Sequence, residues 1–226
     1  MITITATLPT ATLPIRRVLA ELTQAYLYTQ LPQSEHEGHA HVNGKVFKSM
    51  NFKVLYKDCN VTIGFSAISK SYEKEIAMAV LREGLKLGEI HIAQTEIALN
   101  EKYPKSLQSG KIKVKGYVAA AIKDGNSNKK IYLEPKTHKF QEIVHKHTLE
   151  KYETLMRKPY QRDLNITPLY QAPKPRTFYY KRARIRSWYG VYEIEANEDM
   201  LKLILDTGLG AHAMQGLGFV EVVGEI

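Results

Sequence analysis

In the first half of the chain, apolar residues recur either at every second position, as in a strand, or at the spacing of a helix. Ile2, Ile4, Ala6 and Leu8 alternate with threonines, which predicts a strand because successive strand side chains point to opposite faces. Residues 14–31 carry apolar side chains at helical spacing and predict an amphipathic helix. Further strands are expected at 45–56, 60–68 and 89–99, with a helix at 72–87 between the last two. The order β-α-β-β-α-β predicts a ferredoxin-like, or RRM-like, domain over residues 1–108.

The second half repeats this order with additions. Asp124-Gly125-Asn126 predicts a hairpin turn, and Asn197 is expected to cap a short last helix. Helices are expected at 137–157 and 198–206, and strands at 111–118, 130–134, 164–171, 176–186, 189–195 and 220–223. The fold class predicted is therefore α+β, with a second ferredoxin-like domain over residues 109–226 and antiparallel sheets in both.

A glycine-rich segment separates the last helix from the last strand, with the sequence Gly208-Leu209-Gly210-Ala211-His212-Ala213-Met214-Gln215-Gly216-Leu217-Gly218-Phe219. Glycine has no Cβ and tolerates positive φ, so this backbone suits close contact with a ligand, and its N–H groups could bind phosphate oxygens. The Gly-Lys-Ser/Thr end of a nucleotide-binding P-loop is missing, and Ala213 stands where the dinucleotide fingerprint needs glycine. A plain glycine-rich turn is the alternative that these residues leave open.

The positive net charge of the chain indicates a nucleic-acid partner. The formal net charge is +9 and the pI is near 9.4, as expected of a nucleic-acid partner. No acidic residue occurs between positions 171 and 192, a stretch whose basic residues are Lys174, Arg176, Lys181, Arg182, Arg184 and Arg186. Arg182, Arg184 and Arg186 are predicted to share one strand face, and the interleaved aromatic residues could stack on bases. A solvated basic face is the bland alternative.

Other features bound the class of protein. The single cysteine, Cys59, excludes an internal disulfide and a cysteine zinc cluster and suits a reducing, cytoplasmic environment. The sequence indicates no signal peptide and no membrane span.

The helix, the Gly-Leu-Gly triplet, the five-residue spacer, the Gly-x-Gly-Phe group and the final strand together resemble the signature of the RAMP superfamily of CRISPR systems. A basic chain of this length with one such loop near its end looks most like the Cas-six family of endoribonucleases, which cut precursor crRNA. The resemblance implies two tandem ferredoxin-like domains and metal-independent cleavage without a cofactor. In that reaction the 2′-hydroxyl attacks the scissile phosphate and leaves a 2′,3′-cyclic phosphate and a 5′-hydroxyl.

The resemblance also implies a catalytic histidine in the loop after the first helix. His41 occupies that loop, with His39 or Tyr26 as second proton carrier and Lys48 on the phosphate. The side chain of histidine suits both proton roles, because its ordinary pKa of about 6.5 lies near neutral pH. Which of His36, His39 and His41 is the principal histidine stays open, as do a metal site on the three, solvated loop residues and a core position for Tyr26. The RNA-binding residues expected are Gly208, Gly210, His212, Gly216, Gly218, Lys181, Arg182, Arg184 and Arg186.

The partners implied are CRISPR repeat RNA, other Cas proteins of an interference complex and a second copy of the chain. The alternative function is a RAMP-superfamily subunit that binds crRNA without cutting it. A general RRM-type chaperone is disfavoured, because neither half contains the Lys/Arg-Gly-Phe/Tyr-Gly/Ala-Phe motif.

Overall fold

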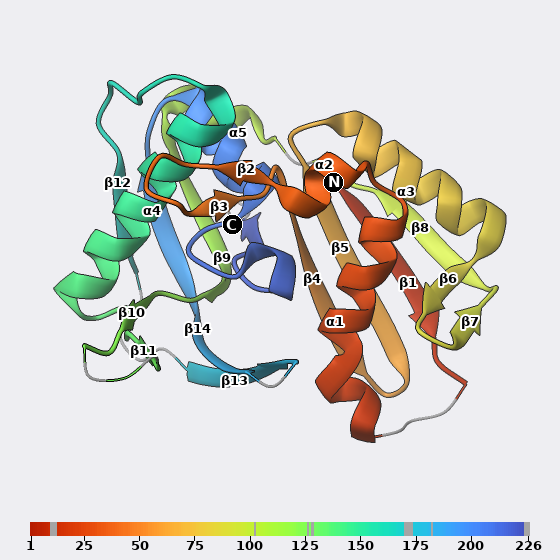
Figure 1. The fold of residues 1–226 in the computed structure, drawn as a ribbon. Helices are drawn as coiled ribbons and strands as arrows, with labels where there is room; N and C mark the ends of the chain where they lie inside the picture. Colours follow the sequence, from red (N-terminus) through yellow and green to blue (C-terminus); the bar gives the residue numbers. More distant parts are fainter. Residues whose placement is uncertain are drawn as a thin grey trace.

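The amino-terminal half is an antiparallel four-stranded sheet with two helices on one face (Figure 1). The strand order is β4-β5-β1-β8, formed by β1 (Ile2–Thr7), β4 (Met50–Lys57), β5 (Asn60–Ala67) and β8 (Thr95–Leu99). The apolar positions Ile2 and Ile4 are fully buried and pack with Leu27 of α1 (Leu13–Thr29) and Val80 of α3 (Lys70–Glu83). This is the predicted ferredoxin-like order.

The carboxyl-terminal half has the same plan. Its sheet order is β12-β14-β9-β15, with β13 also paired to β14. The strands are β9 (Lys111–Val118), β12 (Asn165–Pro168), β13 (Lys174–Tyr180), β14 (Ala183–Glu195) and β15 (Val220–Val222). Helices α4 (His138–Met156) and α5 (Glu198–Thr207) bury Phe140 and Leu201 against this sheet. Thr137 and Asn197 cap them by accepting hydrogen bonds from the N–H groups of Phe140 and Met200. The α+β class and the tandem ferredoxin-like architecture are thus confirmed, and the boundary at residue 108 stays a prediction.

The computed structural model describes residues 1–9, 13–101, 103–125, 127, 129–169, 174–181 and 183–223. Its smaller elements are α2 (Gln33–Glu37), β2 (His39–Ala40), β3 (Val46–Phe47), β6 (Leu85–Leu87), β7 (Ile90–Ile92), η1 (Lys105–Ser109), β10 (Ala121–Lys123), β11 (Lys130–Tyr132) and η2 (Ala213–Gln215).

Several predicted element boundaries were wrong: the strands expected at 45–56 and 89–99 are each divided in two, and two further differences change the chain path. The helix expected to reach residue 87 ends at Glu83, because Gly84 adopts φ 73° and the chain turns into the β6–β7 hairpin. The break expected between 186 and 189 lies earlier, at Lys181, whose φ is 50°. As a result β14 runs unbroken through Arg184, Arg186 and Trp188, so these arginines belong to the second strand of the β13–β14 hairpin.

The loop between α5 and β15, residues 208–219, joins the two halves. Its buried Met214 belongs to the hydrophobic core of the amino-terminal half, and its backbone oxygen accepts a hydrogen bond from Gln24 of α1. Gly216 faces Ala20 of α1 and Phe52 of β4. The glycine-rich loop is therefore packed between the two sheets.

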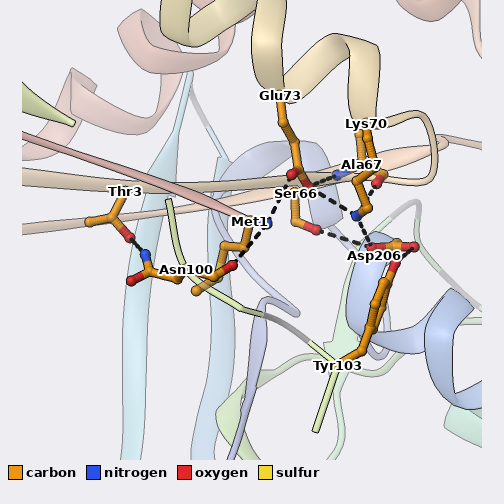
Figure 2. A network of polar contacts seen from close by, with 9 residues as sticks. All are labelled: Met1, Thr3, Ser66, Ala67, Lys70, Glu73, Asn100, Tyr103 and Asp206. Atoms are coloured by element: carbon orange, nitrogen blue, oxygen red, sulfur yellow. Dashed lines mark hydrogen bonds and ion pairs between the residues drawn. The ribbon is translucent and has the colours of Figure 1, made fainter. Parts of the chain in front are cut away.

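A second junction lies at the start of the chain, where polar groups of both halves meet (Figure 2). Lys70 of α3 donates to Asp206 of α5 at 3.0 Å and to Glu73 at 3.2 Å. Asp206 also accepts from Tyr103 at 2.6 Å, and Glu73 binds the terminal ammonium of Met1 at 2.8 Å. This network ties α5 to the amino-terminal sheet.

Replacing Gly210 with alanine tests how tightly the glycine-rich loop is held. Gly210 has φ 73°, and a Cβ there would lie 2.6 Å from the Ala119 carbonyl oxygen. Gly44 has φ 81°, and a Cβ there would meet nothing within 4 Å, so G44A carries the left-handed backbone penalty without the clash. We expect G44A to lower the free energy of unfolding by about 1–2 kcal/mol. G210A should lower it by about 2 kcal/mol more in urea denaturation. Equal losses in the two variants would contradict the packed loop.

Candidate functional site

A cleft runs between the two sheets and has the glycine-rich loop as its floor. Two adjoining cavities of ≈240 Å³ and ≈120 Å³ form it and share Val54, Arg176, Phe178 and Gly216. β4 supplies one wall, β9, β13 and β14 supply the other, and residues 216–219 lie at the bottom.

The second wall carries an aromatic platform with a cation on it. The ring of Tyr117 lies 5.2 Å from that of Phe178 and 5.1 Å from that of Tyr189, centroid to centroid. The Arg176 guanidinium lies 5.0 Å from the Phe178 ring centroid. Lys115 lines the same wall, and Lys53 lies opposite, paired with Glu221 at 2.6 Å. Cations beside a cluster of aromatic rings form a surface suited to the backbone and bases of a single-stranded nucleic acid.

The predicted RNA-binding arginines lie on the other face of this hairpin. Directly paired strand residues share a face, and Arg176 pairs with Ser187 while Arg186 pairs with Thr177. Arg184 and Arg186 are exposed and share the strand face of Tyr179 and Thr177, which line the smaller cavity; Lys181 is exposed at the hairpin turn, and Arg182 lies outside the described residues. Their contact with RNA stays a prediction.

The glycines of the loop have structural tasks. Gly208, Gly210 and Gly218 are buried with positive φ, and a Cβ on each would fall within 2.7 Å of a neighbouring atom. The N–H of Leu209 donates to Gly218, that of Ala211 to Ala119 and that of Gly218 to Tyr117. Gly216 and His212 remain partly exposed, so direct RNA contact by the loop is now expected near these two residues.

The residues predicted for catalysis have different surroundings. Tyr26 is only 6% exposed, belongs to the amino-terminal core, and its hydroxyl is directed at the Gly84 oxygen. His41 lies in the β2–β3 hairpin with Nε2 3.4 Å from Glu153 of α4. His39 Nε2 is 3.8 Å from Glu35, beyond hydrogen-bonding distance. Tyr26 therefore packs in the amino-terminal core and His41 faces α4, and neither contacts Lys48 among the described interactions; the catalytic roles of His41, His39, Tyr26 and Lys48 stay predictions.

Lys48 instead meets a different tyrosine and a different histidine. The rings of Tyr28 and His36 lie 4.6 Å apart, and Lys48 Nζ lies 5.5 Å from the Tyr28 ring centroid. His36 Nε2 is 2.6 Å from the Tyr28 carbonyl oxygen, and Lys48 donates to the carbonyl oxygens of Glu35 and His36. All three side chains are partly exposed. They form a compact Tyr28–His36–Lys48 cluster where α1 ends and α2 begins.

The electrostatics of this cluster assign its protons. A carbonyl oxygen only accepts, so His36 Nε2 carries a hydrogen and Nδ1 of the neutral ring keeps its lone pair. Burial, with smaller contributions from Tyr180 and Glu35, raises the pKa of Tyr28 to about 12, so its phenol stays protonated at neutral pH. Burial lowers the pKa of Lys48 from its usual value, and Glu35 opposes that effect.

Helix α1 connects the cluster to the cleft. Ala20, Gln24 and Tyr28 are spaced by four residues and so share one helix face, which spans about 12 Å along the axis. Ala20 lines the cleft, and Gln24 bonds to both the loop oxygen of Met214 and the Tyr180 hydroxyl. The cluster therefore lies two turns of one helix face beyond the cleft.

Sequence periodicity contained the signal that separates the two tyrosines. Tyr26 falls on the apolar stripe with Leu19 and Leu22, which predicts a core position. Tyr28 lies off that stripe and is free for another surface. His36 is among the three candidate histidines, and nothing in the spacing of these histidines distinguishes it.

A buried lysine binds the backbone at the start of the glycine-rich loop. Lys151 of α4 is 3% exposed and donates to the carbonyl oxygens of Thr207 at 3.2 Å and Gly208 at 2.7 Å. These are carbonyls at the carboxyl end of α5, which lack helical partners and favour a cation. Burial lowers the pKa of Lys151 to about 7.

In the described part of the chain, no three His, Cys, Asp or Glu side chains gather as a metal site. Within the same residues, no helix is long and apolar enough to cross a membrane.

Comparison with known proteins places this architecture in a class. A family model described as "CRISPR associated protein Cas6, C-terminal" matches residues 117–222, the segment that holds the β13–β14 hairpin and the glycine-rich loop. The fold is one of two ferredoxin-like units. Residues 117–222 match the Cas6 family, so the resemblance to that family is confirmed for the carboxyl-terminal half.

Solved structures share the fold along the whole chain. A structure characterising a Cas6-related gene from Pyrococcus furiosus has a TM-score of 0.72 at 16% identity, covering 100% of this chain and 99% of that one. A structure described as "An RAMP protein binding different RNA substrates" has a TM-score of 0.70 at 16% identity, covering 99% of each chain. A Cas6 product complex has a TM-score of 0.70 at 13% identity, covering 98% of each. A search among curated proteins gave no match.

The depressed pKa of Lys151 predicts a specific pH dependence of stability. The unfolded lysine has a pKa near 10.4, so between about pH 7 and pH 10 the unfolded chain binds more protons and stability rises with pH. We expect the K151M variant to lose this rise: from pH 7.0 to 9.5 the free energy of unfolding should gain about 2 kcal/mol less in K151M than in wild type. Urea denaturation at the two pH values measures it.

The control for this prediction is K146M, which removes an exposed lysine from the same helix. Its pH dependence should match that of wild type. A K151M profile parallel to wild type would mean that Lys151 is protonated throughout this range.

Proposed function

We propose that this protein is a metal-independent endoribonuclease that cuts CRISPR repeat RNA in precursor crRNA. The observation that carries the proposal is the Tyr28–His36–Lys48 cluster, which lies on the helix face that lines the cationic cleft. The match of residues 117–222 to the Cas6 family supports RNA as the substrate, as do the similar structures of a RAMP protein binding RNA substrates and of a Cas6 product complex.

The cleft suits a single strand of RNA. Bases can stack on Tyr117, Phe178 and Tyr189, while Arg176 and Lys115 contact phosphates. The strand then passes the loop at Gly216 and follows α1 towards the cluster.

The reaction proposed is attack of a ribose 2′-hydroxyl on the adjacent phosphorus. His36 Nδ1 takes the 2′-hydroxyl proton, the 2′-oxygen bonds to phosphorus as the P–O5′ bond breaks, and the leaving 5′-oxygen takes a proton from a water molecule, giving a 2′,3′-cyclic phosphate and a 5′-hydroxyl. The Lys48 ammonium stabilises the additional negative charge on the phosphorane, and the Tyr28 hydroxyl, protonated at neutral pH, donates a hydrogen bond to a phosphate oxygen. Positive charge and fixed donors thus perform the task that a metal performs in other nucleases.

A second candidate function is a crRNA-binding subunit that does not cut. One observation favours it: His36 Nε2 and two of the three Lys48 donors are already engaged with backbone oxygens. Such contacts also occur in a cluster that only holds α2 against α1. Assembly with other Cas proteins, a homodimer and a cytoplasmic location stay predictions.

Substitution of His36 separates the two functions. We expect H36A to cleave repeat RNA at least about 100-fold more slowly than wild type in EDTA, since a positioned acid–base group contributes about 10²–10⁴. Its affinity for uncleaved repeat RNA carrying a 2′-deoxy nucleotide at the scissile position should stay within about threefold, because the cleft is unchanged. K48A and Y28F should also slow cleavage.

H41A is the matched control, because it removes the neighbouring hairpin histidine. It should retain cleavage within about threefold once its stability has been matched by temperature. Loss of cleavage in H41A with full activity in H36A would return the site to the hairpin. Tight binding without cleavage by wild type would favour the second function.

The cleft predicts a salt signature. Replacing Arg176 with glutamine should weaken single-stranded RNA binding and reduce the slope of log K against log salt by about 0.7, the value for one lost phosphate contact. R82Q, on an exposed position of α3, is the control and should leave the slope unchanged. Fluorescence anisotropy at several salt concentrations measures both; an unchanged slope in R176Q would remove Arg176 from the RNA path.

A further inference from the structure

A separate cavity of ≈390 Å³ is lined by residues 210–212 of the glycine-rich loop, which the cleft does not use. Four parts of the chain build it: the β2–β3 hairpin, the β10–β11 hairpin, α4 and residues 210–212. Its volume falls in the range of about 300–1,000 Å³ that is typical of small-molecule sites. Nothing in the proposed cleavage reaction uses this cavity.

The walls are largely apolar, with Phe47, Ala121 and Val144 among the lining residues. Three lysines, Lys45, Lys123 and Lys130, also line it. A cavity with apolar walls and lysines along its lining suits a flat, uncharged group attached to a negatively charged backbone.

Two histidines supply hydrogen-bonding groups. His147 and His212 both line the cavity, and burial lowers the pKa of each, that of His147 to about 3. Both rings are therefore neutral at physiological pH, and each has one donor and one acceptor nitrogen. The buried Nδ1 of His147 has no hydrogen-bond partner among the described residues. A buried polar atom without a partner costs stability unless a ligand satisfies it.

An aromatic ring lies beside each of the two histidines. The ring of Phe47 lies 5.0 Å from that of His147 at an interplanar angle of 66°, and the ring of Tyr132 lies 6.0 Å from that of His212. Neutral donor and acceptor groups between ring faces are what an unstacked base requires, because its flat faces stack while its edge hydrogen-bonds.

We propose that this cavity holds the base of one unpaired nucleotide that the bound RNA extrudes from its strand. The proposal rests on the proposed RNA-cleaving function and adds a recognition site to it. The glycine-rich loop lines both sites: residues 216–219 form the floor of the cleft, and residues 210–212 form a wall of the cavity. Phe47 in the cavity precedes Lys48 of the cluster, so a nucleotide held here lies close to the reacting phosphate.

The test is an abasic scan of the CRISPR repeat RNA from the genome that encodes the chain. Each position in turn carries a nucleotide without its base, and affinity is measured for wild type and for A121W, in which an indole fills the cavity. We expect one position at which base removal weakens wild-type binding about tenfold, within the range for loss of a stacked base. A121W should bind intact RNA about tenfold more weakly and be insensitive to base removal at that position.

Two further variants make the result interpretable. I143W fills the cavity from α4 and should reproduce A121W if both are folded, as checked by their melting temperatures. I131W places the same indole on the exposed side of the β10–β11 hairpin and should behave as wild type. If wild type binds the repeat and every abasic position has the same effect in wild type, A121W and I143W, the cavity holds no base. If wild type does not bind the repeat at all, the proposed function fails, and the cavity proposal fails with it.

Discussion

Insertion of the glycine-rich loop between the two sheets is the contact on which the rest of the structure depends. Met214 belongs to the carboxyl-terminal half of the chain, but its side chain packs in the hydrophobic core of the amino-terminal half. Lys151 holds the start of the loop by donating to two backbone oxygens. The apolar packing of Met214 and the hydrogen bonds from Lys151 together fix the loop in a single position. Because the loop forms the floor of the cleft and a wall of the adjoining cavity, both sites have the shape that this packing gives them.

Lys151 binds the glycine-rich loop from the protein interior, so the position of the loop is fixed by buried contacts. Three of the four glycines approach neighbouring atoms too closely for any side chain, and their positive φ values exclude the same substitutions on conformational grounds. The glycine spacing is therefore set by internal packing as well as by access to a ligand. A regular glycine motif and an exposed surface are separate properties, and within the loop His212 and Gly216 are among the partly exposed residues.

Much of the fold followed from periodicity, whereas the site followed only in part. Alternation identified β1 and β9, and the apolar stripe identified α1, because burial on one face leaves a local pattern. The pairing of Arg176 with Ser187 depends on the position of the β13–β14 turn. Because sequence periodicity placed the strand break several residues too late, between 186 and 189, it assigned Arg184 and Arg186 to the first strand of the hairpin instead of the second. Tyr28, His36 and Lys48 meet through α2, a helix of five residues within a polar segment that gives no periodic signal. Contacts between distant segments of this kind are set by tertiary packing and leave no trace in local spacing.

Three junctions hold the two halves in one relative position, and this rigidity is what the proposed chemistry requires. Lys70 and Asp206 join them near the amino terminus, the glycine-rich loop joins them in the middle, and the β2–β3 hairpin binds α4 through Lys45 with Glu150 and His41 with Glu153. Junctions at separated points restrict rotation as well as separation. Proton transfer and charge stabilisation need groups held to within about 0.5 Å. Since RNA would be bound mainly by the carboxyl-terminal wall and cut by groups of the amino-terminal half, this alignment has to be built into the protein before the substrate arrives. His41 thus contributes to the site through the position of its hairpin, which carries Phe47 to the cavity and Lys48 to the cluster.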